Sequence, residues 1–381
     1  MASDRAARFQ PTMETLCALL LGRIQVGLVR GNAGALRILA ARLIRESLMA
    51  ALRQEGHEFT EGRFFAWFAG LDTLSTGSEA ILRPPKALCQ AILTEFQHSP
   101  WPDFANASDH LLKAFLAPSD YSRGDDHEAA HTVIAEALAL LSGLEAAEDA
   151  LPFQPVARLL SAAAGSTRFA REERNLDLIG GRAVERERPG NSRWALDILA
   201  GRYLAPRHGL PLALPLPGLV VLPLGQTDEI EEELAISDAS VPTTLHAVLA
   251  RIDRWLEEAE RDAETIRRQL QDRRSSGRAG QLAEYLAGFG PLRGYQIECL
   301  LGVSRTGVGV IAKALESSGL IVSQVSRNAN RMYGYAALPS PPQADGAAGN
   351  AFAVSAEAMN EYEDSMRVID ELLDRFSEKR D

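Results

Sequence analysis

The segment 127–131, HEAAH, has the spacing of a helical zinc site. Its two histidines stand four residues apart, so on a helix both imidazoles could bind zinc from one face, with Glu128 as general base. Residues 124–126, GDD, come directly before His127 and place the motif at a helix start in solvent. The alternative is therefore an acidic helix N-terminus that the helix dipole stabilises. We favour this alternative and expect neither a metal ion nor another cofactor.

A second motif that could do chemistry is Arg188–Trp194, RPGNSRW. Gly190, Asn191 and Arg193 resemble the Gly-Asn-Gly-Arg loop that holds an anion in Fic enzymes, which transfer nucleotides to hydroxyl groups. The His-Pro-Phe that precedes this loop in Fic enzymes is absent, so the base that would deprotonate the target hydroxyl is missing. We therefore predict no catalytic residue. Two enzyme alternatives stay open, a degenerate Fic-type nucleotidyltransferase-like protein and a zinc hydrolase.

A stretch that begins at Ile297 has the spacing of two helices that cross steeply around a shared apolar plug. Ile297 and Leu301 would face inward from the first helix. Gly302 would form the tight turn, because glycine adopts positive φ without penalty. Val303 would fill the turn, and Ser304 would cap the next helix. The inner face of that next helix would consist of Val308, Ile311, Ala312 and Leu315.

The exposed side of this second helix would face the major groove of DNA. The residues predicted to contact DNA are Ser304, Arg305, Thr306, Gly309 and Lys313 on the helix, with Arg327, Asn328 and Arg331 on the hairpin that follows. Arg305 could bind guanine through two hydrogen bonds, whereas Arg327 and Arg331 could meet phosphate or the minor groove. Gly307 and Gly309 each cost roughly 1 kcal/mol inside a helix, but their small size would let the helix lie close to DNA.

The residues from 280 to 338 are locally basic in an acidic chain. They contain Arg293, Arg305, Lys313, Arg327 and Arg331 against Glu284, Glu298 and Glu316, whereas the whole chain has a net charge of -11. This balance suits site-selective DNA binding better than non-specific coating. The alternative is a module of this kind that contacts only proteins. Glu298 departs from the pattern, since helix-turn-helix sequences usually have a small residue at that place.

The elements that must position these residues form a winged helix-turn-helix, predicted over residues 280–338. The expected helices span 281–287 and 295–301 and continue from Ser304, and the expected hairpin has strands at 320–322 and 331–337. Gly290 and Pro291 would end the first helix. The turn of the hairpin would be the Asn-rich segment between the strands.

Residues 10–225 are predicted to form an α-helical domain of unknown function. Apolar residues recur there at helical spacing, and alanine is abundant. Helices are expected within 13–53 and at 86–97, 111–116, 129–146 and 194–203, with a loop at 98–110. No strand-like alternation stands out before Leu210. The apolar segment 210–224 is too short and too rich in proline to span a bilayer, so it should pack as buried extended chain.

A long helix is expected within residues 240–275, capped by Thr243 or Thr244. Its apolar residues form one stripe, which either packs within its own subunit or belongs to a spacer that also pairs two subunits. After a linker at 339–353, a helix at 354–378 carries the a/d seam of a coiled coil. The seam residues are Met359, Tyr362, Met366, Ile369, Leu373 and Phe376. This seam predicts a homodimer, and the alternative is that the helix packs back on its own chain.

The composition sets the class of protein. Hydrophobic residues make up 46% of the chain and charged residues 24%, which is typical of a soluble globular protein. The three cysteines are far apart, which excludes a disulfide framework and argues against a thiolate zinc site. The first residues lack the features of a signal peptide. The sequence therefore predicts a cytoplasmic, mostly α protein with a helical N-terminal domain, a C-terminal winged helix-turn-helix and no membrane partner.

The chain resembles a family of uncharacterised rhizobial proteins, which join an α-helical N-terminal domain of unknown function to a C-terminal helix-turn-helix. The matching stretches include Arg83–Glu95, Leu210–Leu219, the long helix and Leu300–Tyr335. The predicted wing is also similar to the C-terminal winged helix of Fic-domain proteins. The resemblance implies an architecture and no reaction. We therefore predict a transcriptional regulator that binds double-stranded DNA sequence-specifically, as a homodimer, with an unidentified effector at its N-terminal domain.

Overall fold

A computed structural model describes residues 12–74, 84–118, 125–144, 153–170, 176–179, 182–185, 192–220, 240–271, 276–325 and 331–336. Of residues 125–129, 176–179, 182–185, 240, 276 and 325 it describes the backbone alone. The described residues all lie in one compact unit, which spans Met1–Pro339. The predicted linker at 339–353 and the predicted helix at 354–378 lie outside the described residues.

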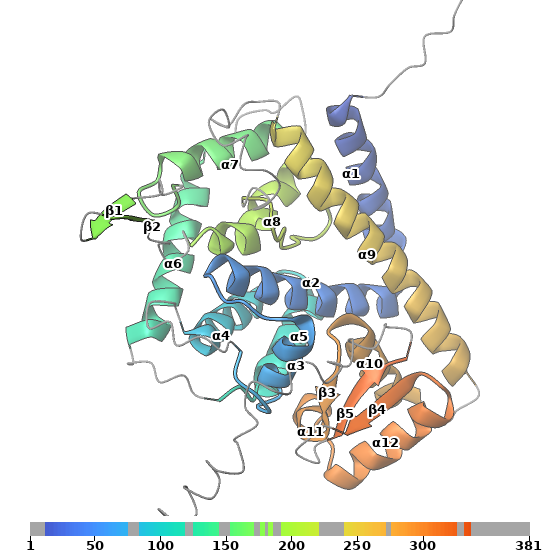
Figure 1. Cartoon of the computed structure of the whole chain (residues 1–381). Helices are drawn as coiled ribbons and strands as arrows, with labels where there is room; N and C mark the ends of the chain where they lie inside the picture. The colour runs from blue at the N-terminus through green and yellow to red at the C-terminus, as the bar shows by residue number, and fades with distance from the viewer. Residues whose placement is uncertain are drawn as a thin grey trace, which may run out of the picture. The chain divides into compact units, whose positions relative to one another are not determined.

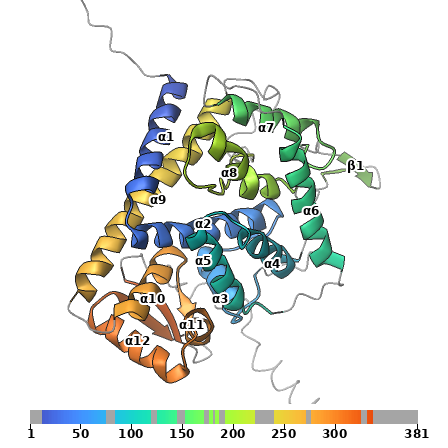
Figure 2. The same ribbon diagram turned by 180° about the vertical axis from the view of Figure 1, so that it is seen from behind.

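Helices make up most of the described chain, which confirms the predicted mostly α fold class. The first nine described helices are α1 Met13–Arg30, α2 Ala33–Gln54, α3 Glu61–Phe68, α4 Pro85–Phe96, α5 Pro102–Lys113, α6 Asp125–Ser142, α7 Gln154–Gly165, α8 Trp194–His208 and α9 Ser240–Leu270. Both ribbon views show α1 lying along α9 (Figures 1 and 2). Within the described part of the chain, no helix is both long enough and apolar enough to cross a membrane.

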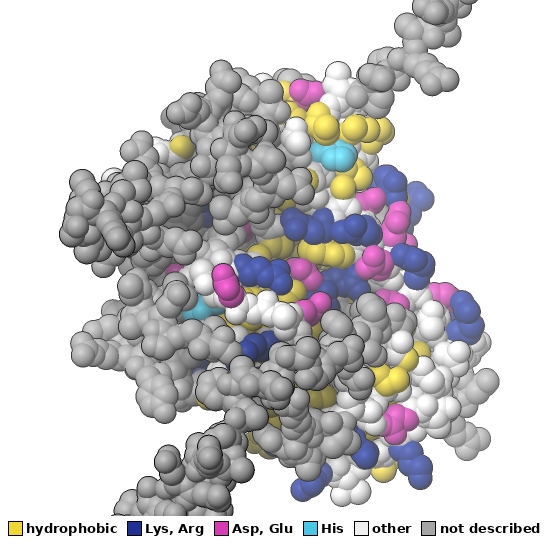
Figure 3. Space-filling model, in the orientation of Figure 1, with side chains coloured by type: hydrophobic (Ala, Val, Ile, Leu, Met, Phe, Trp, Pro, Cys, Tyr) yellow, Lys and Arg dark blue, Asp and Glu magenta, His cyan; other side chains and the backbone are white. Residues whose placement is uncertain are grey.

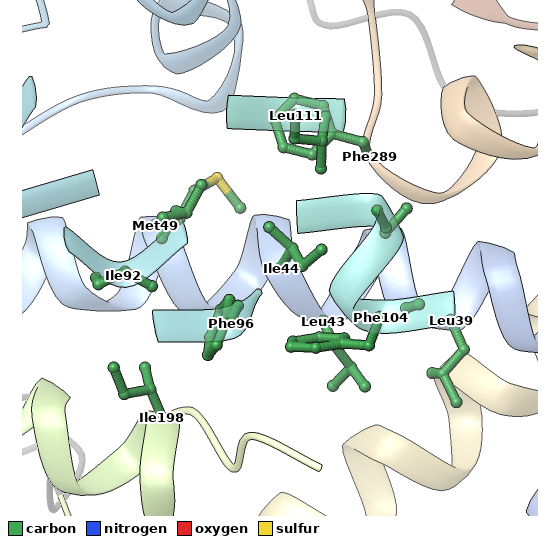
Figure 4. Close-up of a cluster of buried hydrophobic side chains, with 14 of the residues drawn as sticks. Leu39, Leu43, Ile44, Met49, Ile92, Phe96, Phe104, Leu111, Ile198 and Phe289 are labelled. Atoms are coloured by element: carbon green, nitrogen blue, oxygen red, sulfur yellow. The ribbon is translucent and has the colours of Figure 1, made fainter. Parts of the chain in front are cut away.

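Helix α2 runs through the centre of the hydrophobic core. Alanine and leucine, both strong helix formers, dominate its sequence. The Asn32 side chain caps it by accepting a hydrogen bond from the Ala35 N–H at 2.8 Å. Figure 4 shows Leu39, Leu43, Ile44 and Met49 of α2 among Ile92 and Phe96 of α4, Phe104 and Leu111 of α5, and Ile198 of α8. Because α2 is buried on nearly every side, it holds the other helices in place.

Helix α5 corrects the prediction of a loop at 98–110. Pro102 occupies the first turn of the helix, where its missing N–H costs nothing. Phe104, Ala107, Ser108 and Leu111 then follow one another at helical spacing and are all buried. The polar residues Asp103, Asn106 and Asp109 were typical of a loop, but they lie on the polar side of an amphipathic helix, where Asn106 is exposed and both aspartates are half-buried. Burial of the apolar face overrides the local preference of the polar residues.

A short antiparallel hairpin corrects the prediction that no strand precedes Leu210. Its strands are β1 Leu176–Ile179 and β2 Arg182–Glu185, and Ile179 pairs with Arg182. The sequence between them is Gly180-Gly181. Two glycines in a two-residue connection suit the turns that need positive φ. The two consecutive glycines are therefore a hairpin signal in the sequence.

Helix α9 buries its apolar stripe within this chain. Leu245, Val248, Ile252, Leu256, Ala259 and Ile266 are at most 4% exposed. The helix packs against α1, α2 and the first helix after residue 275, which agrees with packing inside one subunit. It begins at Ser240, so Thr243 and Thr244 lie inside the helix and do not cap it. Charged pairs, including Arg23 with Asp253 at 3.1 Å, cover its outer side.

The segment after α8 packs as buried irregular chain, as predicted, over the residues that the structure describes. Leu214, Leu216, Leu219 and Val220 are buried. The carboxylate of Asp197 holds the segment, accepting hydrogen bonds from the Gly218 N–H at 2.8 Å and the Val220 N–H at 2.7 Å. Burial raises the pKa of this carboxyl to about 6. The segment and α8 are thus joined by a fully buried acid.

The elements after residue 275 alternate helices with a small sheet. They are α10 Ser276–Gly288, β3 Leu292–Arg293, α11 Gly294–Leu301, α12 Arg305–Ser317, β4 Ile321–Val325 and β5 Arg331–Tyr335. The sheet is antiparallel with strand order β3-β5-β4. Strand β3 was not predicted, because two residues carry no periodicity. The predicted helices and hairpin strands of this region all have counterparts, although α10 begins at Ser276 and not at residue 281, and β4 continues to Val325 and does not end at residue 322.

Candidate functional site

The connection between α11 and α12 is a tight turn built on one glycine. Gly302 has φ 60° and ψ 40°, and its N–H donates to the Glu298 carbonyl oxygen. A Cβ at Gly302 would meet nothing within 4 Å, so the left-handed backbone is the reason for glycine there. Ser304 then caps α12, its side chain accepting from the Gly307 N–H at 3.3 Å. The predicted turn and cap are confirmed.

The inner face of α12 packs against α10, α11 and β4. Val308, Ala312 and Leu315 are buried, as predicted. Ile297 of α11 is fully buried, whereas Ile311 is only partly buried. Glu298, the departure from the usual pattern, is half-buried. Its backbone carbonyl accepts from both residues of the turn, since Val303 N–H also donates to it at 3.2 Å.

The outer face of α12 is open to solvent. The predicted contact residues Ser304, Arg305, Thr306, Gly309 and Lys313 are all exposed. Within the described part of the chain, no acidic side chain pairs with Arg305 or Lys313. Sequence reasoning missed Val310, which is 67% exposed on the same face. Its exposure could have been expected from its position, one residue after Gly309 and two after the buried Val308.

The two glycines of α12 differ in what surrounds them. A Cβ at Gly307 would lie 3.3 Å from the Cβ of Val303, which is a tight contact inside the protein. A Cβ at Gly309 would meet nothing within 4 Å. Close packing against the turn thus gives a reason for glycine at the first position. At the second position the described structure gives none, although glycine costs roughly 1 kcal/mol there.

The β4–β5 hairpin lies beside α12. Figure 3 shows basic side chains along the lower edge of the face it displays, over the C-terminal elements. Arg331, at the start of β5, is exposed and pairs in register with Val325. Arg327 and Asn328, also predicted to contact DNA, lie outside the described residues. The structure therefore brings Arg331 to the tip of the described hairpin.

The two enzyme motifs lie only partly within the described residues. The side chains of His127 and Glu128 lie outside them, and His131 lies on α6. The described side chains include no group of three metal-ligating residues. Of the motif at 188–194, Arg193 is described, and its guanidinium donates to the carbonyl oxygens of Phe169 at 2.7 Å and Val220 at 3.3 Å. This arginine therefore holds the protein backbone.

Helices α10 and α11 are fixed to the N-terminal helices by buried contacts that sequence reasoning missed. The side chain of Gln296 is fully buried and donates to the carbonyl oxygens of Ala114 at 2.9 Å and Phe68 at 3.3 Å. Its own oxygen accepts from the Arg293 N–H at 2.8 Å. Phe289 inserts between aromatic rings of α3, with its centroid 4.8 Å from that of Phe68. No local pattern marks these residues, because their partners are distant in sequence.

A polar cavity of about 110 Å³ lies where α2, α5 and α10 meet. Arg37 of α2 and Glu284 of α10 form a bidentate ion pair along it, with both N–O distances 2.7 Å. His110 of α5 lies beside Tyr285 of α10, with 2.7 Å between Nδ1 and the hydroxyl oxygen. Burial lowers the pKa of His110 and raises the pKa of Tyr285. The cavity thus touches both the N-terminal helices and the C-terminal elements.

No protein-family model matches this chain. No curated protein matches it either. The resemblance to a rhizobial family and to the wing of Fic-domain proteins therefore stays a prediction, and the function is argued from the geometry of α12 and its surroundings.

Proposed function

We propose that this protein is a transcriptional regulator that binds double-stranded DNA, with α10 to β5 as a winged helix-turn-helix. The observation that carries the proposal is the outer face of α12, where Arg305, Gly309 and Lys313 are all exposed to solvent. The order of elements supports it, since a glycine turn joins α11 to α12 and an antiparallel hairpin follows. In this arrangement α12 is the recognition helix.

Three properties of α12 favour DNA over a protein partner. Its exposed cations have no acidic partner among the described residues, so phosphate or a base edge could pair with them. Gly309 has no side chain on the outer face of α12, so the backbone there could lie close to the floor of a DNA groove. Val310 supplies an exposed apolar group that could contact the methyl group of thymine. A protein-contact surface would be expected to be more apolar and less basic at its centre.

Specific binding also fits the charge of the whole chain. A net charge of -11 repels DNA at long range, so contacts to particular bases must contribute to affinity. Arg305 is the first residue of α12, and in this proposal it contacts the edge of a guanine. The exposed Arg331 of the wing would contact phosphate or the minor groove. We include a cytoplasmic location and a homodimer in the proposal.

The first experiment is to find the operator. The purified full chain is mixed with fragmented genomic DNA, and the retained fragments are sequenced. Enrichment of a shared site supports the proposal. Uniform recovery of all fragments, or of none, would contradict a sequence-specific regulator.

The second experiment tests the groove assignment on that operator. Arg305→Ala should weaken specific binding by about 1–3 kcal/mol, the contribution of a bidentate base contact. The matched control is Arg254→Ala, which removes the same charge from an exposed position on α9. Gel-shift titrations should show a loss for the first variant only. Equal affinities for wild type and Arg305→Ala would remove Arg305 from the interface.

A further inference from the structure

We propose that the cavity between α2, α5 and α10 is an effector site for a small organic cation that carries a primary ammonium group. Its lining includes Arg37 of α2, Asp103 and His110 of α5, and Gln281, Glu284 and Tyr285 of α10. Polar groups from three elements thus converge on one space, which is typical of a ligand site. At about 110 Å³, it is well below the roughly 300 Å³ of the smallest usual drug pockets. The ligand must therefore be small.

Part of the lining is satisfied within the protein, and part is not. Arg37 and Glu284 use their charges on each other, and His110 contacts the Tyr285 hydroxyl. Asp103, and likewise the amides of Asn106 and Gln281, make no hydrogen bond or ion pair within the described part of the chain. These three side chains belong to two different helices that face each other across the cavity. They offer a carboxylate and two amides to a ligand.

The balance of charge selects a cation. Arg37 and Glu284 neutralise each other, and partial burial lowers the pKa of His110, which disfavours its charged form. Asp103 therefore leaves the lining with one negative charge, which an ammonium group would pair with. The rings of His110 and Tyr285, arranged edge to face with centroids 6.0 Å apart, also line the cavity. A carboxylate ligand would instead be repelled by both acids of the lining.

The position of the cavity would couple ligand binding to DNA binding, a step that rests on the proposed function. Helix α10 lines the cavity and also packs against α12. A ligand held between Asp103 of α5 and Gln281 of α10 would fix α10 more firmly on the N-terminal helices. A ligand that binds one arrangement of α10 better than another increases the fraction of molecules in that arrangement. Because α12 packs on α10, the fraction of molecules whose recognition helix can reach DNA changes with it. The N-terminal helices thereby gain a regulatory role.

Binding is tested by calorimetric titration of the full chain with 1,4-diaminobutane, and with butane-1,4-diol as a neutral ligand of the same length. The diamine should bind and the diol should not. Asp103→Asn should weaken diamine binding by about tenfold or more, since hydrogen bonds to charged groups contribute roughly 1.5–3 kcal/mol. The matched control is Asp109→Asn, which removes the same charge from α5 outside the cavity. The proposal would be overturned if Asp103→Asn bound the diamine as tightly as wild type, or if wild type bound the diol as tightly as the diamine.

Coupling is tested by measuring operator affinity with and without the diamine, in wild type and in Asp103→Asn. Diamines also bind DNA directly, so only a change of several-fold that disappears in Asp103→Asn supports the effector role. Diamine binding with the same operator affinity in both proteins would overturn that role. If the chain binds no DNA but still binds the diamine through Asp103, the proposed function fails and the cation site stands.

Discussion

At the scale of single residues, Gly309 is the most informative position on the candidate interface. Gly309 is exposed because the neighbouring Val308 faces inward. Its exposure does not require glycine, because a Cβ at this position would meet nothing within 4 Å. Alanine is favoured over glycine in a helix by about 1 kcal/mol. Under the proposed function, close approach of DNA to the backbone of α12 would give a reason for glycine at this exposed position.

Gly309→Ala should therefore raise the stability of the protein by up to about 1 kcal/mol and weaken operator binding by roughly tenfold. The first effect follows from helix propensity and the second from a methyl group that holds α12 off the groove. The matched control is Gly22→Ala in α1, where a Cβ also meets nothing within 4 Å. Urea unfolding and gel-shift titration measure the two effects. Undiminished operator binding by Gly309→Ala would contradict close approach at this point.

Asp197 gives a prediction for pH dependence. Burial, opposed by the hydrogen bonds from Val220, Gly218 and Gln54, raises its pKa from 3.8 to about 6. Because the folded-state pKa is the higher one, the contribution to stability is full below pH 3.8 and is lost as the pH rises through about 6. The free energy of unfolding contributed by this group should fall by about 2 kcal/mol between pH of about 4.5 and about 7.5.

The variant Asp197→Asn isolates this contribution, because asparagine does not titrate. Its overall stability can move in either direction, since the amide NH₂ would face one of the donors that the carboxylate now accepts from. The difference in unfolding free energy between wild type and variant should nevertheless shrink or become negative as the pH rises across that range. Urea unfolding at several pH values measures it. A difference that stays constant would show that Asp197 is ionised throughout.

At the scale of elements, the contact of α10 with α2 joins the C-terminal elements to the rest of the described chain. Gly288 lies against α2 so closely that a Cβ there would clash with the carbonyl oxygen of Ile38. The Arg37–Glu284 ion pair and the inserted Phe289 flank this contact. The proposed recognition helix therefore packs, through α10, on the N-terminal helices.

Gly288→Ala should destabilise the protein by about 1–3 kcal/mol, because the backbone of α2 cannot move aside as a flexible side chain would. Gly280→Ala on the same helix is the matched control, since the nearest atom to its Cβ would be a Leu270 methyl carbon at 3.8 Å. Thermal or urea unfolding compares the two. A Gly288→Ala protein as stable as the control would show that α10 can shift along α2 at little cost.

At the scale of the whole molecule, the proposed homodimer depends on the C-terminal helix predicted at 354–378. The a/d residues from Met359 to Phe376, predicted to form a dimer seam, lie outside the described residues. The apolar stripe of α9, to which the spacer hypothesis assigned the pairing of two subunits, is buried inside the chain. Any coiled coil at 354–378 must then hold the dimer without that stripe, and short helices are marginal alone.

Truncation after Ser340 should shift the protein toward monomer in sedimentation and weaken binding to a palindromic operator. Two recognition helices spaced one turn of DNA apart read such a site together, and a monomer reads half of it. Binding to a single half-site should be unchanged, which serves as the control. If the truncated chain keeps the mass and the operator affinity of the full chain, the tail is not the dimer element.

The sequence by itself determined the features whose causes lie close together along the chain. Gly302 and Ser304 define the turn and cap of α12 through backbone geometry and one local hydrogen bond, so both could be predicted with their roles. The helices of residues 13–53 and α9 followed from apolar spacing in the same way. Which face of α12 would be open also followed, because helical spacing that buries Val308 exposes Gly309.

Only the tertiary structure decided the features whose partners lie far apart. Strand β3 forms because it pairs with β5. Gln296 is buried because it donates hydrogen bonds to carbonyl oxygens at the ends of α3 and α5. The cavity forms where α2, α5 and α10 meet. Helix α5 was misjudged for the same reason, since its polar residues favour a loop until the core buries its other face. The contact of Gln296 with Ala114 joins residues 182 positions apart. Local propensities are too weak to encode them, so packing decides.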